Sequence, residues 1–516
     1  MMKQHWLQFV AWLCCLLLGA AQQQATAQLG ISNVWTMGYD GGVGEDSWGE
    51  PFGGENILFS ANSREIFTQN RWMDYGRTVA NISDPAGALL FSSNGVYVGD
   101  SAGNLMQNGD SLNPSFYASQ YTNHPAGIHI PQGCLILPKP AAPGIYYLFH
   151  GTIDDAPTFT AHYLYLTTIN MNLNDGLGAV VAKNQVVLSD TLNPGRITAV
   201  RHANGRDWWL FCHKDNTNMY DRLLVTPTGV EVDGTQAIGI VRYWDIGSVC
   251  FSPDGSRFAY IANNNGFCRI DLFDFDRCTG LFSNPLLLET PDTTFAMGVA
   301  FSPNSRFLYA TATWSVYQFD TEAPDIQASR VHLAHWDSTY SPSPPFAALF
   351  DMAQLAPDGK IYISTGNSGL VLHVINNPDS AGLACGMVQH GVELPRLNMN
   401  SLPNHPNYHL GAVEGSVCDS LGLSALTPGP SPRERGGVRA SPNPTTGQFT
   451  LSYPAHAREG WLLVRNLAGQ LVLRERLPQW STIHEVELQG HAAGMYQCSL
   501  RWGVETTATR VILTER

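Results

Sequence analysis

The sequence predicts an all-β protein, and three observations support this prediction. The chain is 44% hydrophobic and only 14% charged, and its 49 glycines indicate many turns. Short apolar or alternating runs rich in aromatic and β-branched residues recur between those turns, as at 145–149 and 258–262. Helical spacing over more than three turns is hard to find between Ile31 and Cys418. Short strands joined by tight turns are therefore expected over most of the chain.

A repeat in the middle of the chain predicts how these strands are arranged. FSPDGSRF at 251–258 recurs as FSPNSRF at 301–307 and as LAPDGKIY at 355–362, with a degenerate copy at 200–208. In each copy an apolar strand ends, a turn reverses the chain, and a second strand begins. The register advances by 50 and then 54 residues, which is typical of a propeller blade. The predicted blade turns are Pro253, Asp254, Gly255, Pro303, Asn304, Pro357, Asp358 and Gly359.

The segment that contains the repeat is long enough for a complete β-propeller. Residues 28–425 accommodate six to eight blades at roughly 45 to 55 residues each. We expect about seven. Blades before Ala199 are not legible as copies of the repeat.

The first residues form a secretory signal peptide, which we assign to 1–27. Lys3 supplies positive charge, an apolar run follows, and Ala25 and Ala27 provide the small-x-small pattern that a signal peptidase accepts. Cleavage is expected to leave Gln28 as the mature terminus. The run is too short to span a bilayer comfortably, so export is expected without a retained anchor.

Charge and cysteine content narrow the function further. A formal net charge of −14 argues against nucleic acid as a partner, because nucleic-acid binding needs a basic footprint. Eight cysteines remain after the signal peptide, and an oxidising compartment allows some of them to pair. The candidate disulfides join Cys268 to Cys278 and Cys385 to Cys418, because each pair brackets a compact segment. Buried free thiols are the alternative, since connectivity does not follow from sequence.

Several phrases of the large domain resemble a known family. They are ISDPAGALLF at 82–91, LILPKP at 135–140, NGRDWW at 204–209 and SLPNHPNY at 401–408. These phrases are similar to exported proteins found with type IX secretion, including gliding-motility-associated proteins, and the Pro-Asp-Gly turns resemble those of WD-repeat-like propellers. The resemblance implies an architecture and a location at the cell surface or outside the cell, and it brings no catalytic residues.

The end of the chain has a different pattern. Residues 426–440 are rich in proline, glycine and charge and are interpreted as a linker. Residues 441–516 are expected to form a small immunoglobulin-like β-sandwich. Their motifs resemble, in order and spacing, the type A C-terminal sorting domain of the type IX secretion system; a sandwich without a sorting role is the alternative. The motif residues are Pro442, Asn443, Pro444, Gly447, Asn466, Gly469, Gly494 and Tyr496.

The resemblance of the tail implies partners and a route. It implies passage through the periplasm, recognition by the type IX machinery at the outer membrane, and removal of the tail by a sortase-like enzyme. The remaining protein would then be released or joined to an anionic lipopolysaccharide. The ligand of the propeller itself, a surface glycan or a protein, is not identified by the sequence.

No catalytic, cofactor-binding or metal-binding residues are predicted. The Gly-Asp-Ser-Leu sequence at 109–112 matches an esterase motif, but Asn113 and Pro114 follow at once in an all-β region, where that nucleophile lacks its α/β setting. His405 and His409 have metal-ligand spacing without a helix to present them. We therefore expect a binding or structural module. The alternative is a hydrolase or lyase acting on polysaccharide or peptide, with its site in the propeller channel.

Overall fold

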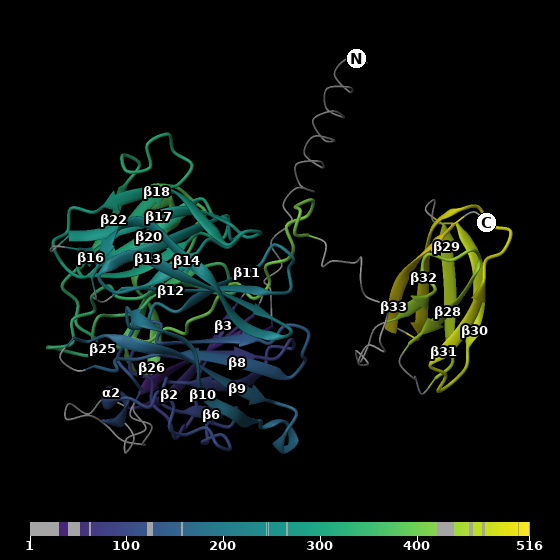
Figure 1. Cartoon of the computed structure of the whole chain (residues 1–516), viewed down its shortest axis with the longest axis horizontal. Coiled ribbons are helices and arrows are strands. Elements are labelled where there is room, and N and C mark those ends of the chain that lie inside the picture. The colour runs from purple at the N-terminus through teal and green to yellow at the C-terminus, as the bar shows by residue number, and fades with distance from the viewer. Residues whose placement is uncertain are drawn as a thin grey trace, which may run out of the picture. The chain divides into compact units, whose positions relative to one another are not determined.

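The computed structural model describes residues 30–39, 52–60, 63–120, 127–155, 158–243, 245, 247–264, 267–419, 438–453, 458–466, 470–503 and 505–514. The predicted signal peptide with Ala25, Ala27 and Gln28, almost all of the predicted linker, and Gly469 of the tail motif lie outside these residues. The chain divides into two compact units, Met1–Leu421 and Gly422–Arg516 (Figure 1). No helix in the described part is long and apolar enough to cross a membrane.

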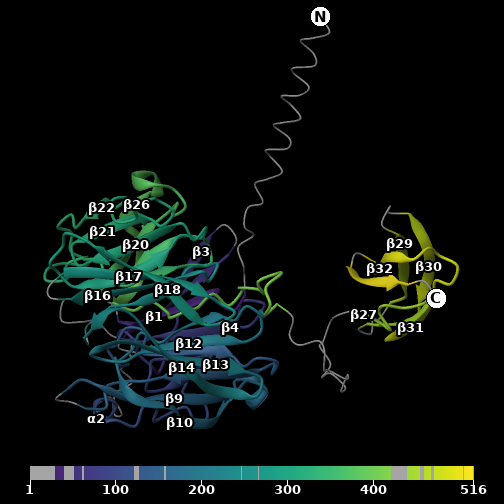
Figure 2. The same ribbon diagram turned by 45° about the horizontal axis from the view of Figure 1, so that its top comes forward.

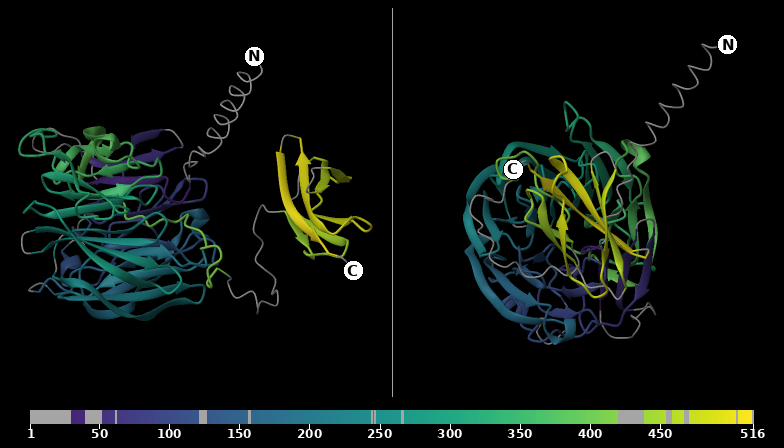
Figure 3. Two further views of the ribbon diagram at one scale, coloured as in Figure 1. Left: turned by 90° about the horizontal axis from the view of Figure 1, so that it is seen from above. Right: turned by 90° about the vertical axis from the view of Figure 1, so that its right-hand side faces the viewer.

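The first unit is a seven-bladed β-propeller, counted over the described residues. Each blade is an antiparallel sheet whose strands follow one another in sequence order. The blades are arranged in a ring (Figures 1, 2 and 3). The first two blades have three strands: β1 (Val34–Tyr39), β2 (Gly53–Phe59) and β3 (Arg64–Thr68), then β4 (Ala80–Ser83), β5 (Leu89–Ser93) and β6 (Val98–Asp100). The prediction of an all-β propeller is confirmed.

The other five blades have four strands. The third consists of β7 (Cys134–Pro138), β8 (Ile145–His150), β9 (Ala161–Asn170) and β10 (Ala179–Leu192). The fourth consists of β11 (Thr198–Arg201), β12 (Trp208–His213), β13 (Thr217–Thr226) and β14 (Gly229–Arg242). The fifth consists of β15 (Val249–Phe251), β16 (Arg257–Asn264), β17 (Phe267–Asp276) and β18 (Leu281–Glu289). The sixth consists of β19 (Ala296–Phe301), β20 (Phe307–Ala312), β21 (Ser315–Asp320) and β22 (Val331–His335). The seventh consists of β23 (Ala353–Leu355), β24 (Ile361–Ile363), β25 (Ser368–Ile375) and β26 (Met387–Met399).

The first strands of successive blades lie around the ring axis. Contacts join β1 to β4, β4 to β7, β11 to β15, β15 to β19 and β19 to β23. The last strand, β26, contacts all three strands of the first blade, which closes the ring. Within the described part of this unit, three short helical turns interrupt the β architecture: α2 (Phe116–Ser119), η1 (Asn174–Gly176) and η2 (Gly382–Cys385).

Local turn chemistry explains the first hairpin of each repeat. In the fifth blade the Ser252 hydroxyl donates to Asp254 Oδ1 at 2.5 Å, and the same carboxylate oxygen accepts from Ser256 N at 3.0 Å. Gly255 has φ +73°, a conformation that glycine adopts without strain. The sixth blade repeats the pattern with Ser302 and Asn304. Polar side chains thus bond the backbone at the reversal, as the sequence predicts.

The second blade has a turn of the same kind, although its sequence does not match the repeat. Between β4 and β5, Asp84 Oδ1 accepts from the N–H groups of Ala86 and Ala88 at 2.8 and 2.9 Å, and Gly87 has φ +91°. Here aspartate precedes proline, whereas it follows proline in the legible repeats. The family phrase at 135–140 runs along β7 and continues into the turn before β8 with Lys139 and Pro140. Two of the sequence segments that resemble the family therefore include blade turns.

Aromatic side chains pack neighbouring blades together. One buried cluster joins the fourth and fifth blades through Trp209, Phe211, Tyr220, Phe258, Phe273 and Phe282. Phe211 and Phe282 have ring centroids 4.7 Å apart, and Tyr220 meets Phe273 edge to face at 5.9 Å. Such pairs add stability beyond the area they bury.

The second unit is a two-sheet β-sandwich. One sheet has the order β27 (Arg439–Ser441), β28 (Gln448–Ser452), β31 (Ile483–Glu487), and the other has the order β30 (Leu471–Leu477), β29 (Gly460–Asn466), β32 (Gly494–Trp502), β33 (Glu505–Leu513). Inward side chains alternate along the strands and form one buried core that includes Phe449, Leu462, Val464, Leu500 and Val511.

The disulfide pairing differs from both predicted pairs. Cys278 bonds to Cys418, with Cα atoms 5.6 Å apart, whereas Cys268 and Cys385 are buried free thiols. Cys268 lies within β17, where its side chain is enclosed by the blade core; Cys278 lies in the turn after that strand. Proximity in sequence therefore misled the prediction, because a strand carries its two ends apart.

Candidate functional site

The segment after the last blade runs back through the ring. Residues 401–418, which we call the strap, follow β26 and bond to the inner strands of several blades. The lime-green chain at the end of the propeller in Figure 2 is the outer part of this segment. The strap therefore occupies the place where the first strands of the blades converge.

Asn404 joins the strap to three blades. Its backbone N–H donates to Val79 O at 2.9 Å, before β4. Its side-chain amide donates to Cys134 O at 3.0 Å in β7 and to Ile197 O at 2.8 Å before β11. Asn404 is only 5% exposed, so these bonds are shielded from water.

Gln132 completes this junction. Its side-chain amide donates to Val249 O and accepts from Val249 N, both at 2.8 Å, as a neighbouring strand would. The same amide nitrogen lies 3.3 Å from Asn404 Oδ1. The third and fifth blades are thereby bridged across the inner strand of the fourth.

Further along, the strap is fastened towards the outside of the ring. The Tyr408 hydroxyl donates to Ile136 O at 2.8 Å, and the Arg277 guanidinium donates to Gly411 O. Val413 N donates to Ala203 O at 2.8 Å, and the Cys278–Cys418 disulfide follows. The strap therefore fixes the ring by hydrogen bonds and one covalent link.

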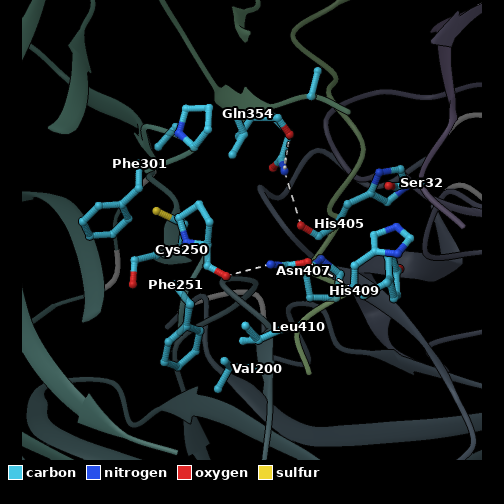
Figure 4. Close-up of a pocket in the computed structure, with 18 of the residues that line it drawn as sticks. Ser32, Val200, Cys250, Phe251, Phe301, Gln354, His405, Asn407, His409 and Leu410 are labelled. Carbon is cyan, nitrogen blue, oxygen red and sulfur yellow. Dashed lines mark hydrogen bonds between the residues drawn. The ribbon is translucent and has the colours of Figure 1, made fainter. Parts of the chain in front are cut away.

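A cavity of about 720 Å³ lies between the strap and the blade turns (Figure 4). The turns of the fifth, sixth and seventh blades form one wall and present Pro253, Pro303 and Pro357 in turn. Strap residues 404–411 form the opposite wall. The side chains of Phe251, Phe301, Leu355, Val200, Leu410 and Trp35 supply its apolar surface. The predicted blade turns are thus brought together at one cavity, with Gly255 lying just behind it.

The carboxylates of this cavity are engaged in their own turns. Asp254 accepts bonds from Ser252 and Ser256; burial raises its pKa, but these hydrogen bonds outweigh the effect and hold the pKa below its ordinary value. Asp358 accepts from the Tyr362 hydroxyl at 2.7 Å and from Lys360 N at 3.2 Å. Both carboxylates therefore act as turn acceptors that also face the cavity.

The two strap histidines are neutral at physiological pH. His405 Nε2 lies 2.8 Å from Asn81 O, so this nitrogen carries the proton, and burial lowers the pKa of the ring to about 4. Burial, followed by the charge of Arg201, also lowers the pKa of His409. The described residues contain no group of three His, Cys, Asp or Glu side chains placed to hold a metal. The structure assigns these histidines to the strap wall.

Two amide side chains of the cavity wall are held in place by hydrogen bonds within the protein. Asn407 donates to Pro253 O at 2.7 Å and accepts from His409 N at 3.0 Å, so its amide joins the strap to the fifth-blade turn (Figure 4). Gln354 reaches across from the seventh blade and donates to His405 O at 3.3 Å. The cavity thus combines apolar patches with fixed amide groups, the composition of many small-ligand sites.

The motif residues of the tail meet at one end of the sandwich. Asn443 donates to Arg510 O at 2.8 Å and accepts from Ile512 N at 2.9 Å, so one side chain satisfies two backbone groups of β33. Thr445 continues this pairing, since Thr445 N donates to Ile512 O at 2.8 Å. The opening segment therefore extends the sheet beyond its last strand.

The other tail motifs pack next to this contact. Gly494 and Tyr496 pair with Leu513 and Val511, and Asn466 pairs with Tyr496 from the next strand. The Tyr496 hydroxyl donates to Ala492 O at 2.7 Å. A β-carbon on Gly447, whose φ is +134°, would lie 2.9 Å from Gln489 Cγ. Asn443, Asn466, Gly494 and Tyr496 thus lie on or against β32 and β33, at the edge that the opening segment extends.

Sequence reasoning located the turns and the tail motif but missed the strap. The phrase SLPNHPNY at 401–408 was assigned only by resemblance, and nothing in its composition shows that Asn404 bonds to three blades. One feature of the sequence could have indicated the strap. Several polar residues flanked by prolines follow the last predicted blade directly, and a simple linker would not need such side chains.

Comparison with known proteins agrees with this division of the chain. Residues 440–514 match the family described as the secretion system C-terminal sorting domain. No curated protein matches the chain. Three solved structures that resemble it share 11–12% identity: a protein from Lactobacillus plantarum, the propeller of Dos1, and the periplasmic gluconolactonase of Pseudomonas aeruginosa.

These similarities to solved structures are weak. The TM-scores are 0.41, 0.41 and 0.35, and the alignments cover 72%, 72% and 89% of this chain and 99%, 87% and 99% of the other chains. The match of the tail is the informative result. The match to the C-terminal sorting domain indicates a substrate of the type IX secretion system that is exported to the cell surface or secreted.

Proposed function

We propose that the propeller is a binding module that the sorting domain delivers to the outside of the cell. The observation that supports binding is the cavity of about 720 Å³, where three blade turns and the strap present apolar side chains and fixed amides. A small glycan or a short peptide segment suits such a surface, because it offers both apolar faces and hydrogen-bonding groups.

The cavity supports binding better than hydrolysis. A hydrolase needs a positioned acid and base, and the carboxylates on this wall, Asp254 and Asp358, already accept bonds from their own turns. The second candidate is therefore a hydrolase or lyase that cleaves polysaccharide or peptide at a site in the propeller channel. It predicts product formation, which binding alone does not.

A blocked cavity tests the binding role. The mature full chain is screened against a glycan array and a peptide library beside Leu355→Trp, which fills the cavity wall, and Val181→Trp, an equally bulky change on an exposed outer strand. We expect ligands that the parent and Val181→Trp retain and Leu355→Trp loses. Equal retention by both variants would place the binding surface elsewhere, and cleaved ligand would favour the hydrolase.

We further propose that the tail is removed after passage, as in the family that it resembles, and that the protein is then released or attached to an anionic lipopolysaccharide. Deleting residues 441–516 should hold the propeller in the periplasm. Normal surface arrival of the truncated protein would refute the sorting role. Mass spectrometry of surface protein should lack the peptide 511–516, and its detection there would contradict removal.

A further inference from the structure

Most of the positive charge of the tail lies on one face of its sandwich. Residues 28–425 hold 18 Lys and Arg against 36 Asp and Glu, whereas residues 441–516 hold seven against six. Every basic residue of the tail is arginine. The strand register shows where these arginines lie, because side chains on one face of a sheet form rows across paired strands.

Three successive rows on the outer face of the β30-β29-β32-β33 sheet contain arginine. The first row is Arg476, Trp461, Arg501 and Thr506; the second is Arg474, Leu463, Ser499 and Ala508; the third is Leu471, Arg465, Gln497 and Arg510. The inward residues of the same strands, such as Leu462, Val464 and Leu500, are buried. We call the outward rows the arginine face.

The arginine face contains no carboxylate in its three rows. Among the described residues, Arg501 and Arg510 form no ion pair, and Arg476 reaches only Glu459 at 3.9 Å, beside the first row. Arg474 stacks on Trp461, with its guanidinium carbon 4.1 Å from the ring centroid. Glu485 and Glu487 are exposed on the other sheet of the sandwich. The two faces therefore carry opposite charge.

The arginine face leads directly to the sorting motif. Beyond its third row, Met495 pairs with Ile512, and both are exposed, at 37% and 43%. The side chain of Asn443 bonds to the backbone of Arg510 and Ile512. The motif thus fixes the strand that carries Arg510, and the charged rows continue into a small apolar edge.

We propose that the arginine face is the docking surface of the sorting domain for an acidic protein surface of the secretion machinery. This inference rests on the proposed sorting role of the tail. Arginine, tryptophan and methionine are the side chains enriched at protein interfaces, and guanidinium groups bind carboxylates in two-point contacts. A protein partner is favoured over a lipid surface because Trp461 lies beneath Arg474 rather than projecting outward as membrane-inserting aromatics do.

Charge reversal on the two faces provides the test in producing cells. The full chain carries Arg501→Glu with Arg510→Glu, and the matched control carries Glu485→Lys with Glu487→Lys on the opposite sheet. We expect the first variant to reach the surface roughly five- to tenfold less, because electrostatic complementarity governs docking rates. The control should reach it normally. Equal export of both variants would overturn the proposal.

Two further arms separate the proposal from folding and from the sorting role. Arg501→Lys with Arg510→Lys keeps the charge and should restore most of the export; failure to do so with an unchanged melting temperature would contradict a charge-based surface. If deletion of 441–516 blocks export while charge reversal does not, the sorting role stands and the docking surface falls.

A lipid partner is examined separately. The purified full chain is sedimented with phosphatidylcholine vesicles that contain phosphatidylglycerol. We expect the parent and the Arg501→Glu, Arg510→Glu variant to behave alike. Arginine-dependent binding to these vesicles would assign the face to lipid and overturn the protein partner.

Discussion

The two units of this protein hold an end of their chain in place in different ways. The strap, residues 401–418, returns to the inner strands, where Asn404 bonds to three blades, and it ends at the covalent link from Cys418 to Cys278. The tail holds its opening segment beside its final strand through the side chain of Asn443 and backbone bonds of Thr445. The propeller end is therefore held by buried hydrogen bonds at Asn404 and by a disulfide among its more exposed last residues, whereas the tail end lies at an accessible edge.

The difference matches the division of labour. A binding module outside the cell benefits from an end that resists fraying, because frayed ends are cleaved first. A sorting signal has to be reached by its receptor, and an exposed edge allows this. The net charge follows the same division, since the acidic residues are concentrated in the propeller and five arginines of the tail lie on the arginine face.

The largest effect is expected from Asn404→Ala in the strap. The change leaves Cys134 O and Ile197 O without partners inside the protein, and burying unsatisfied carbonyls costs on the order of 4 kcal/mol in total. Thermal unfolding of the full chain should show a lower propeller transition and an unchanged tail transition. Asn407→Ala, which loses two half-buried bonds, one to Pro253 O and one from His409 N, is the matched control. Equal losses for the two variants would contradict the strap's role.

Acid should destabilise the propeller and spare the tail. Burial lowers the pKa of His150 and His213 to about 3 and that of His373 to about 4, whereas the unfolded rings titrate near 6.5. The unfolded state therefore binds more protons as pH falls through 6.5, and stability is lost below that value. Burial raises the pKa of Glu55 to about 8, which offsets part of this loss because its folded form is already protonated.

The net change between pH 7 and pH 5 is on the order of 3 kcal/mol against the propeller. Chemical denaturation at the two pH values measures it. The described tail histidines, His484 and His491, are not buried, so the tail midpoint should move less. A propeller midpoint that is independent of pH would show that the buried rings do not control its stability.

Breaking the disulfide should have a smaller and more local effect. Cys278→Ser with Cys418→Ser removes a link between residues 140 apart in sequence, and such a link typically stabilises by about 2 to 4 kcal/mol. Limited proteolysis should then cut near Val413 first, since only the backbone bond to Ala203 and nearby contacts hold that end. The double change of Cys268 and Cys385 to serine leaves the link intact and should not open the strap.

The smallest effect is expected in the tail itself. Asn443→Ala removes two exposed hydrogen bonds to β33 and should cost about 1 kcal/mol. Hydrogen exchange at Ile512 N should accelerate, while the propeller should be unaffected. Protection that remains at Ile512 would show that the opening segment is held by other contacts.

How much was predictable from sequence depended on how local the cause was. The turns at Pro253, Pro303 and Pro357 were legible because the side chains that form them lie within a few residues. The strap was not, because His405 bonds to Asn81 and Asn404 to Ile197 across 324 and 207 residues. The predicted disulfide pairs were wrong for the same reason, because the true partner of Cys278 lies at the end of the strap.

The cavity combines a part that the sequence predicts with a part that it does not. Its turn wall could be placed from the repeat, whereas its strap wall and therefore its shape could not. The tail was predicted from its motif, but the arginine face required the strand register, which sets the side to which each residue points.

The position of the strap also sets the order in which the propeller is assembled. Its contacts join blades made early to the last residues of the propeller, so the inner strands gain these bonds only after the strap has been synthesised. Until then, the inner carbonyls of Cys134 and Ile197 lack the partner that they have in the finished protein. The timing of propeller closure is thus encoded in the location of one asparagine near the end of the domain.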